Sequence, residues 1–206
     1  MIKIIDYKAG NAPSVLRAAR RLGYEAAFAR APQDLTGASH IILPGVGSAR
    51  ATIDSLREAG LLPALERAVR QDKTLFLGIC VGLQILFEHS EEEDTSCLGW
   101  LRGRVVKFDA ARVRVPQMGW NKVSFTKNAP AVSAREGYFY FVNSYYARPA
   151  DEGDRWASAD YGGAFTAAVQ KDNLYATQFH VEKSGEEGLR LLGNFLAARQ
   201  GGRAKC

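Results

Sequence analysis

The first 90 residues alternate short apolar runs with amphipathic stretches, and this alternation constrains the fold more than any other feature. The apolar runs predict strands at 2–5, 24–29, 40–43 and 74–77. Apolar residues at helical spacing predict helices over 13–22, 52–58, 62–71 and 82–88. Because the strands are continuously apolar and alternate with helices, we expect a parallel sheet covered by helices on both faces.

The second half of the chain has more closely spaced apolar runs, separated by turns rich in Gly, Asn, Asp and Pro. It predicts strands at 104–108, 122–125, 138–142, 165–169 and 174–178, and a closing amphipathic helix at 188–198. We expect these strands to add antiparallel elements to the sheet. No repeat or linker interrupts the pattern, which predicts one α/β domain over 1–199 and a frayed tail at 200–206.

Composition excludes several classes of protein. The chain of 206 residues is 47% hydrophobic and 24% charged, which is typical of a globular domain and not of a disordered one. No apolar run reaches the roughly 18 residues that span a bilayer, and the N-terminus lacks a signal layout. With three cysteines, we expect no disulfide framework and a cytoplasmic location. The net charge of +5 is interpreted as a solvated surface, because no basic run indicates nucleic-acid binding.

A candidate nucleophile lies where a predicted strand turns into a predicted helix. The segment Gly78-Ile79-Cys80-Val81-Gly82 is the thiol version of the G-x-S-x-G elbow. The two glycines relieve crowding in this sharp turn, which projects the thiol above the carboxyl edge of the sheet. The N-terminus of the helix favours a thiolate there. A small buried cysteine in a tight turn is the alternative interpretation of this segment.

A thiol nucleophile needs a base, and the chain has three histidines. His89 falls at the end of the predicted helix, roughly 13 Å from Cys80 at about 1.5 Å per residue. His40 opens its strand at the opposite edge of the sheet, so both are expected at strand-end or surface positions. His180 follows the carboxyl end of a strand, and Glu182 shares its face in extended backbone and can orient it. The Cys and His spacing does not fit zinc, so no metal is expected.

Acyl transfer also needs donors for an oxyanion. The backbone N–H of Val81, directly after the nucleophile, is one candidate. The segment Leu43-Pro44-Gly45-Val46-Gly47 ends a strand at the same edge, and its glycines permit close approach of a ligand. Val46 and Gly47 are therefore further candidate donors, although the segment taken alone is better explained as a plain turn.

Longer segments carry a family resemblance. Residues 78–84 (GICVGLQ) and 178–184 (QFHVEKS) resemble motifs of the class I (triad) glutamine amidotransferases. The resemblance narrows to the glutaminase subunits of imidazole glycerol phosphate synthase, in histidine biosynthesis, through DYKAGN (6–11), LPGVG (43–47), PQMGWN (116–121) and YFVNSYY (140–146). It runs from residue 4 to about 195 and implies a flavodoxin-like class I amidotransferase fold.

The resemblance implies an activity, a partner and further site residues. Cys80 would attack the side-chain amide of glutamine, His180 would pass the proton to the departing ammonia, and water would release glutamate from the thioester. The ammonia would reach a (β/α)₈ cyclase subunit in a heterodimer that makes imidazole glycerol phosphate and an aminoimidazole carboxamide ribonucleotide. No cofactor, nucleic acid or membrane is implied. The family pattern places glutamine near Gly45, Gln84, Glu92, Ser144 and Tyr145, and the partner near Asn11, Met118, Trp120 and Lys183.

Four positions depart from the family pattern. The chain has Lys8 where glycine is usual and Ala49 where an aromatic residue is usual. It has Asn143 where histidine is common and Val181 where proline is usual. Val181 bears most on the chemistry, because proline fixes φ near −65° and valine leaves the link from His to Glu less constrained. Lys8 bears on docking of the partner.

Other interpretations stay open at this stage. Another triad amidotransferase subunit, such as that of anthranilate or aminodeoxychorismate synthase, usually has His at the position of Leu83. A flavodoxin-like cysteine hydrolase would not need the combination of Gln84 and H-x-E. A non-catalytic basic module would bind nucleic acid in a salt-dependent way and be indifferent to loss of Cys80. From the residues alone, Met118 and Trp120 would be interpreted as core.

The glycines of residues 45–47 also suggest regulation. A peptide flanked by glycines can present its N–H in either direction. We expect binding of the partner and its nucleotide to select the direction that completes the oxyanion hole, so that the isolated subunit is nearly silent.

Overall fold

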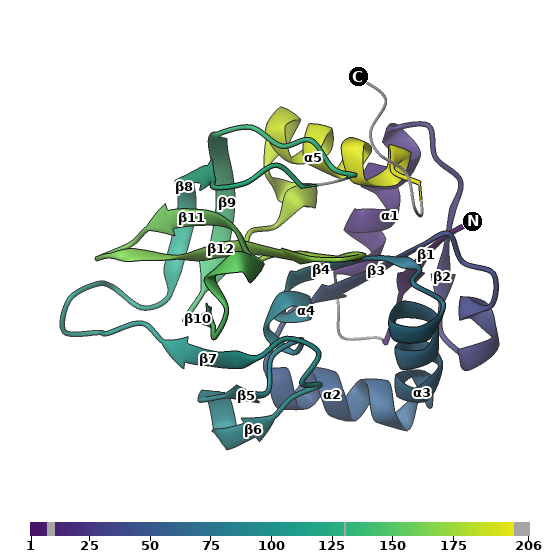
Figure 1. Ribbon diagram of the computed structural model, residues 1–206, viewed down its shortest axis with the longest axis horizontal. Coiled ribbons are helices and arrows are strands. Elements are labelled where there is room, and N and C mark those ends of the chain that lie inside the picture. The colour runs from purple at the N-terminus through teal and green to yellow at the C-terminus, as the bar shows by residue number, and fades with distance from the viewer. Residues whose placement is uncertain (8–10, 130, 200–206) are drawn as a thin grey trace.

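The computed structural model describes residues 1–7, 11–129 and 131–199 and is organised around one sheet (Figure 1). Its first part contains β2 (Ala26–Ala29), β1 (Ile2–Ile5), β3 (His40–Gly45), β4 (Leu75–Cys80) and β13 (Leu174–Thr177), in that spatial order. All neighbours in this group pair in parallel. The predicted parallel sheet is confirmed, and the carboxyl ends of β3, β4 and β13 meet at one edge.

Helices cover both faces of these parallel strands. One face carries α1 (Ala12–Arg21) and α5 (Gly185–Ala197), and the other carries α2 (Ala49–Glu58) and α3 (Leu61–Glu66), which continues into the π-helical turn η2 (Arg67–Gln71) (Figure 1). The short 3-10 turn η1 (Pro32–Leu35) follows β2. Strands β3 and β4 are buried over their full length, since both of their faces are covered.

The second half of the chain extends the sheet mainly through antiparallel pairs, as predicted. From β13 the order continues through β12 (Ala164–Lys171), β10 (Tyr145–Pro149), β7 (Gly103–Lys107), β5 (His89–Ser90) and β6 (Thr95–Ser96). A branch from β12 adds β11 (Arg155–Asp160), β8 (Gln117–Phe125) and β9 (Gly137–Asn143) at the end of the molecule away from β1 and β2 (Figure 1). The 3-10 turns are η3 (Glu92–Asp94), η4 (Glu152–Asp154) and η5 (Val181–Lys183).

A helix over 82–88 was predicted, and this prediction is wrong in length, because α4 spans only Val81–Gln84. The backbone carbonyls of Ile85, Leu86 and Phe87 accept hydrogen bonds from the N–H groups of residues 98, 101 and 99. These carbonyls are therefore not available to a longer helix. These three apolar residues are fully buried. Their spacing in the sequence, which suggested a helix, therefore results from packing of an irregular segment in the core.

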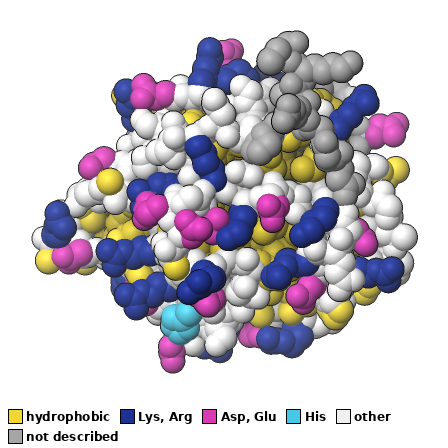
Figure 2. Space-filling view, in the orientation of Figure 1, with side chains coloured by type: hydrophobic (Ala, Val, Ile, Leu, Met, Phe, Trp, Pro, Cys, Tyr) yellow, Lys and Arg dark blue, Asp and Glu magenta, His cyan; other side chains and the backbone are white. Residues whose placement is uncertain are grey.

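The exposure of three residues differs from what the sequence suggests. Met118 and Trp120 are 67% and 56% exposed on β8, so the interpretation as core is wrong. His40 opens β3 as predicted but is buried, and its Nε2 lies 3.1 Å from the carbonyl oxygen of Ala198. On the face in Figure 2, Lys and Arg are interspersed with Asp and Glu.

One sheet runs through the described chain, and the single domain over 1–199 stays a prediction; the tail at 200–206 lies outside the described residues. Within the described ranges, no helix combines the length and apolar character needed to cross a membrane.

Candidate active site

The turn from β4 to α4 presents Cys80 in a strained backbone conformation. Cys80 has φ 57° and ψ −107°, a region that residues other than glycine rarely adopt. A Cβ on Gly78 would lie 2.4 Å from the carbonyl oxygen of Gly82, and a Cβ on Gly82 would lie 2.1 Å from that of Leu43. Both glycines are therefore required by close backbone contacts, and the predicted sharp turn is confirmed.

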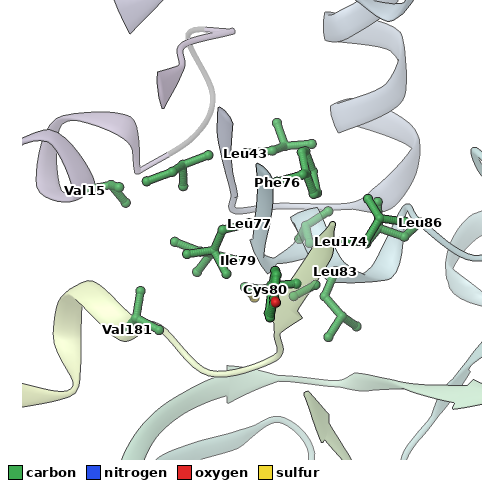
Figure 3. Close-up of a cluster of buried hydrophobic side chains, with 14 of the residues drawn as sticks. Val15, Leu43, Phe76, Leu77, Ile79, Cys80, Leu83, Leu86, Leu174 and Val181 are labelled. Carbon is green, nitrogen blue, oxygen red and sulfur yellow. The ribbon is translucent and has the colours of Figure 1, made fainter. Parts of the chain in front are cut away.

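Cys80 is buried in an apolar surrounding that carries a few polar groups. Figure 3 shows it among hydrophobic side chains such as Ile79 and Leu83. Its Sγ lies 3.9 Å from the carbonyl oxygen of Val142 and 3.6 Å from Nε2 of Gln178. Gln178 was not among the predicted site residues. Its position just after β13 and two residues before His180 was the available signal.

His180 and Glu182 form a buried pair at the same edge of the sheet. Nδ1 of His180 lies 2.8 Å from Oε1 of Glu182, and their side chains are 4% and 0% exposed. Asn11 donates a hydrogen bond of 2.7 Å to the same carboxylate oxygen. The pairing arises differently from the prediction, since the backbone is extended only at His180 and Glu182 belongs to η5. Val181, fully buried between them, leaves the contact intact.

The protonation of this pair is set by its neighbours. Burial alone lowers the pKa of His180, but hydrogen bonds and charges from Cys80 and Glu182 outweigh it and raise this pKa to about 9. Burial raises the pKa of Glu182, and the hydrogen bonds from His180 and Asn11 bring it below its ordinary value. A pKa of about 9 places His180 in its charged form at neutral pH, beside the carboxylate of Glu182.

The other histidines lie away from Cys80. His40 pairs with Leu75 at the start of β4, whereas Gly45 pairs with Cys80 at its end, so His40 is at the opposite edge as predicted. His89 was expected at the end of a helix, and this expectation is wrong. It lies in β5, and its Nε2 is 3.3 Å from the carboxylate of Asp94.

The segment after β3 lies directly against the elbow. A Cβ on Gly45 would be 2.7 Å from Cβ of Val81, so no side chain fits between them. Gly47 has φ 93°, in the region that favours glycine. The backbone of Val46 forms a hydrogen bond with Tyr7, whose pKa is nevertheless raised because burial outweighs this bond.

The residues predicted to bind glutamine gather around β10 and the start of α2. Gln84 is buried and donates to the carbonyl oxygen of Tyr145 over 3.1 Å, and Ser144 precedes that residue. Oε2 of Glu92 accepts a hydrogen bond of 3.0 Å from the N–H of Ala49, and burial raises the pKa of Glu92. Burial raises the pKa of Tyr145, and the negative charge of Glu92 raises it further.

The residues predicted to face a partner have different settings. Asn11 is hydrogen-bonded to Glu182, and Lys183 lies in η5 directly after it. The exposed ring of Trp120 packs edge-on against Tyr140 and reaches the start of α5. Lys8 lies outside the described residues. Among the residues that the structure describes, no group of three or more His, Cys, Asp or Glu side chains is placed to hold a metal.

Comparisons with known proteins agree on one family. The family model for glutamine amidotransferase class-I matches residues 3–198. The "Imidazole glycerol phosphate synthase subunit HisH" of Leptospira borgpetersenii is 42% identical, over 96% of this chain and 100% of its own. The protein of the same name from Geobacillus thermodenitrificans (strain NG80-2) is 44% identical, over 95% of both chains. A solved glutamine amidotransferase structure, 22% identical over 95% of this chain and 96% of its own, shares the fold with a TM-score of 0.76.

The elbow predicts opposite effects for alanine at two glycines. Gly82→Ala lowers the free energy of unfolding by about 3 kcal/mol or more, since its Cβ meets the backbone of Leu43. Gly193→Ala in α5 is the matched control, because its Cβ makes only ordinary contacts at 3.7 Å and alanine favours a helix by up to about 1 kcal/mol. Urea denaturation measures both. Equal stability of the two variants contradicts the role of Gly82.

The pair at His180 predicts a shift in its titration. Glu182→Gln lowers the pKa of His180 from about 9, because an anionic acceptor is lost while Cys80 remains. Titration followed by NMR of the imidazole resonances measures it, with His40 and His89 as internal controls. The raised pKa stabilises the fold fully below pH 6.5, and this contribution is lost as the pH rises through about 9. An unchanged His180 titration refutes the coupling.

Proposed function

The chain belongs to the class I glutamine amidotransferase family, and we propose that it is the glutaminase subunit of an imidazole glycerol phosphate synthase, which hydrolyses glutamine and delivers ammonia for histidine biosynthesis. The observation that carries the activity is the buried His180, which is paired with Glu182 and acts electrostatically with the elbow residue Cys80. Identity of 42–44% over nearly full length to HisH subunits supports the reaction in which the ammonia is used.

The three proposed catalytic residues divide the reaction between them. The Cys80 thiolate attacks the carbon of the glutamine side-chain amide, and the amide oxygen becomes an oxyanion. As the intermediate collapses, His180 gives its proton to the departing nitrogen, so ammonia leaves and a thioester remains. Neutral His180 then takes a proton from water, the resulting hydroxide attacks the thioester, and glutamate and the thiolate are released. Glu182 holds the imidazole in position and stabilises its charged form throughout.

The oxyanion is proposed to bind at backbone N–H groups on both sides of the thiol. Val81 follows the nucleophile, and Val46 and Gly47 belong to the segment packed against the elbow. The glycines of this segment allow its peptide to reorient. The backbone of Val46 is hydrogen-bonded to Tyr7, and reorientation of this peptide on binding of the partner is proposed to couple glutaminase activity to the synthase reaction.

Substrate and partner are assigned to two different sets of residues. Glutamine is proposed to lie near Gly45, Gln84, Glu92, Ser144 and Tyr145. The partner is proposed to be a (β/α)₈ cyclase subunit that forms a heterodimer in the cytoplasm and makes imidazole glycerol phosphate and an aminoimidazole carboxamide ribonucleotide. Exposed apolar side chains on β8 support an interface there, since large apolar groups in water favour burial by another protein.

The first test measures release of glutamate from glutamine by this chain alone and with a cyclase subunit plus its nucleotide substrate. We expect low activity of the chain alone and at least a hundredfold stimulation in the complex, which corresponds to lowering the activation free energy by about 2.7 kcal/mol. We expect Cys80→Ala to abolish the activity. Cys97→Ala is the matched control and should leave activity unchanged, because Cys97 follows β6, where its Sγ donates to the carbonyl oxygen of Thr95. Full activity in Cys80→Ala refutes the mechanism. Equal activity with and without the cyclase refutes the coupling.

The interface predicts a local loss of affinity. Trp120→Ala weakens binding of the cyclase subunit at least tenfold, because an aromatic anchor exposed in the free subunit is removed. Tyr24→Ala is the control, since Tyr24 lies beside His40 at the opposite edge of the sheet. Isothermal titration calorimetry measures both. Equal affinities for the two variants place the interface elsewhere.

A further inference from the structure

We propose that Gln178 donates a hydrogen bond that stabilises the Cys80 thiolate, and that Gln84 acts as a positioning residue that fixes the direction of this bond. The proposal rests on the proposed role of Cys80 as nucleophile. It adds one group in contact with the reacting sulfur and one residue that acts through it. It is carried by a chain of three hydrogen bonds running from Tyr145 to the sulfur.

The direction of the chain is set at Tyr145. Its backbone carbonyl oxygen can only accept hydrogen bonds, and it accepts from Nε2 of Gln84 over 3.1 Å and from Nδ2 of Asn143 over 3.0 Å. A carboxamide has its two N–H donors on one side and its oxygen acceptor on the other. The Gln84 amide must therefore have its nitrogen, and not its oxygen, facing the carbonyl of Tyr145.

The second donor of Gln84 sets the orientation of the next amide. Nε2 of Gln84 also donates to Oε1 of Gln178 over 3.2 Å, which leaves Nε2 of Gln178 facing Sγ of Cys80 at 3.6 Å. If the Gln178 amide turned over, two N–H groups would oppose each other and its oxygen would face the sulfur. Both glutamine side chains are buried, so water does not replace a lost partner.

A donor at this position affects the state of the sulfur. Sγ also lies 3.9 Å from the carbonyl oxygen of Val142, which accepts from a thiol and repels a thiolate. The N–H of Gln178 has the opposite preference, because a donor stabilises the anion. Among the described titratable groups, His180 and Tyr7 act electrostatically with Cys80, and Glu182 lies behind His180. These groups remain the same in the variants used for the test.

The experiment follows alkylation of Cys80 by iodoacetamide as a function of pH, without glutamine, with peptide mass spectrometry to separate Cys80 from the other cysteines. Gln178→Met keeps the length of the side chain and removes the donor. We expect the pH midpoint of alkylation to rise by about one unit, a tenfold change in the thiol–thiolate equilibrium. Gln170→Met is the matched control, since Gln170 is a buried glutamine on β12 whose Nε2 bonds the carbonyl oxygen of Asp172.

The positioning role of Gln84 predicts a particular pattern of non-additivity. Gln84→Met leaves the Gln178 amide free to turn over, so the midpoint rises by less than in Gln178→Met. The double variant has the same midpoint as Gln178→Met, because Gln84 acts only through Gln178. Additive shifts overturn the positioning role, and an unchanged midpoint in folded Gln178→Met overturns the proposal.

Two further arms keep the test decisive. If Gln178→Met does not fold, Gln178→Asn retains a buried amide that is too short to reach the sulfur, and the same upward shift is expected; an unchanged midpoint overturns the proposal. Because alkylation needs no glutamine, absence of glutaminase activity in the wild-type complex refutes the proposed function while the midpoints still test the hydrogen bond.

Discussion

The close approach of the β4–α4 turn to the end of β3 is the constraint on which the site depends. At Gly82 the two backbones leave no room for even a methyl group, because a Cβ would lie 2.1 Å from the carbonyl oxygen of Leu43. This contact holds the residue before the helix in its strained conformation and directs its side chain out of the sheet edge. Gln178, directly after β13, then meets the sulfur, and the end of β3 packs against Val81, since β3, β4 and β13 are parallel neighbours that end together.

Burial gives this small group of residues its chemical character. His180 and Glu182 are almost completely removed from water, which by itself disfavours the charged forms of both. Their mutual contact, the hydrogen bond from Asn11 and the neighbouring thiol reverse that preference. The charged histidine is thus maintained by Cys80 and by Glu182, whose own charged form is favoured by the hydrogen bond from Asn11.

Side-chain amides near the Cys80 sulfur form a network of hydrogen bonds in addition to the charged pair. Gln84, Gln178 and Asn143 converge near one backbone carbonyl, that of Tyr145, and their donors are ordered by it. The segment that carries this carbonyl is also the one assigned to glutamine. These hydrogen bonds therefore link the segment proposed to bind glutamine with Cys80 through groups that hold no charge.

The sequence by itself determined the parallel α/β architecture, the elbow and the choice of His180, because each depends on local pattern or on elimination among few residues. Apolar runs and glycine spacing reflect backbone requirements that act within a few residues. The length of α4, the burial of His40 and the exposure of Trp120 were decided only in the tertiary structure. Carbonyls 85–87 bond to residues 98–101 and not to a helix, and no local pattern reports such a contact. Gln178 was missed for the same reason, since the meaning of a buried amide depends on which partners the fold brings to each of its ends.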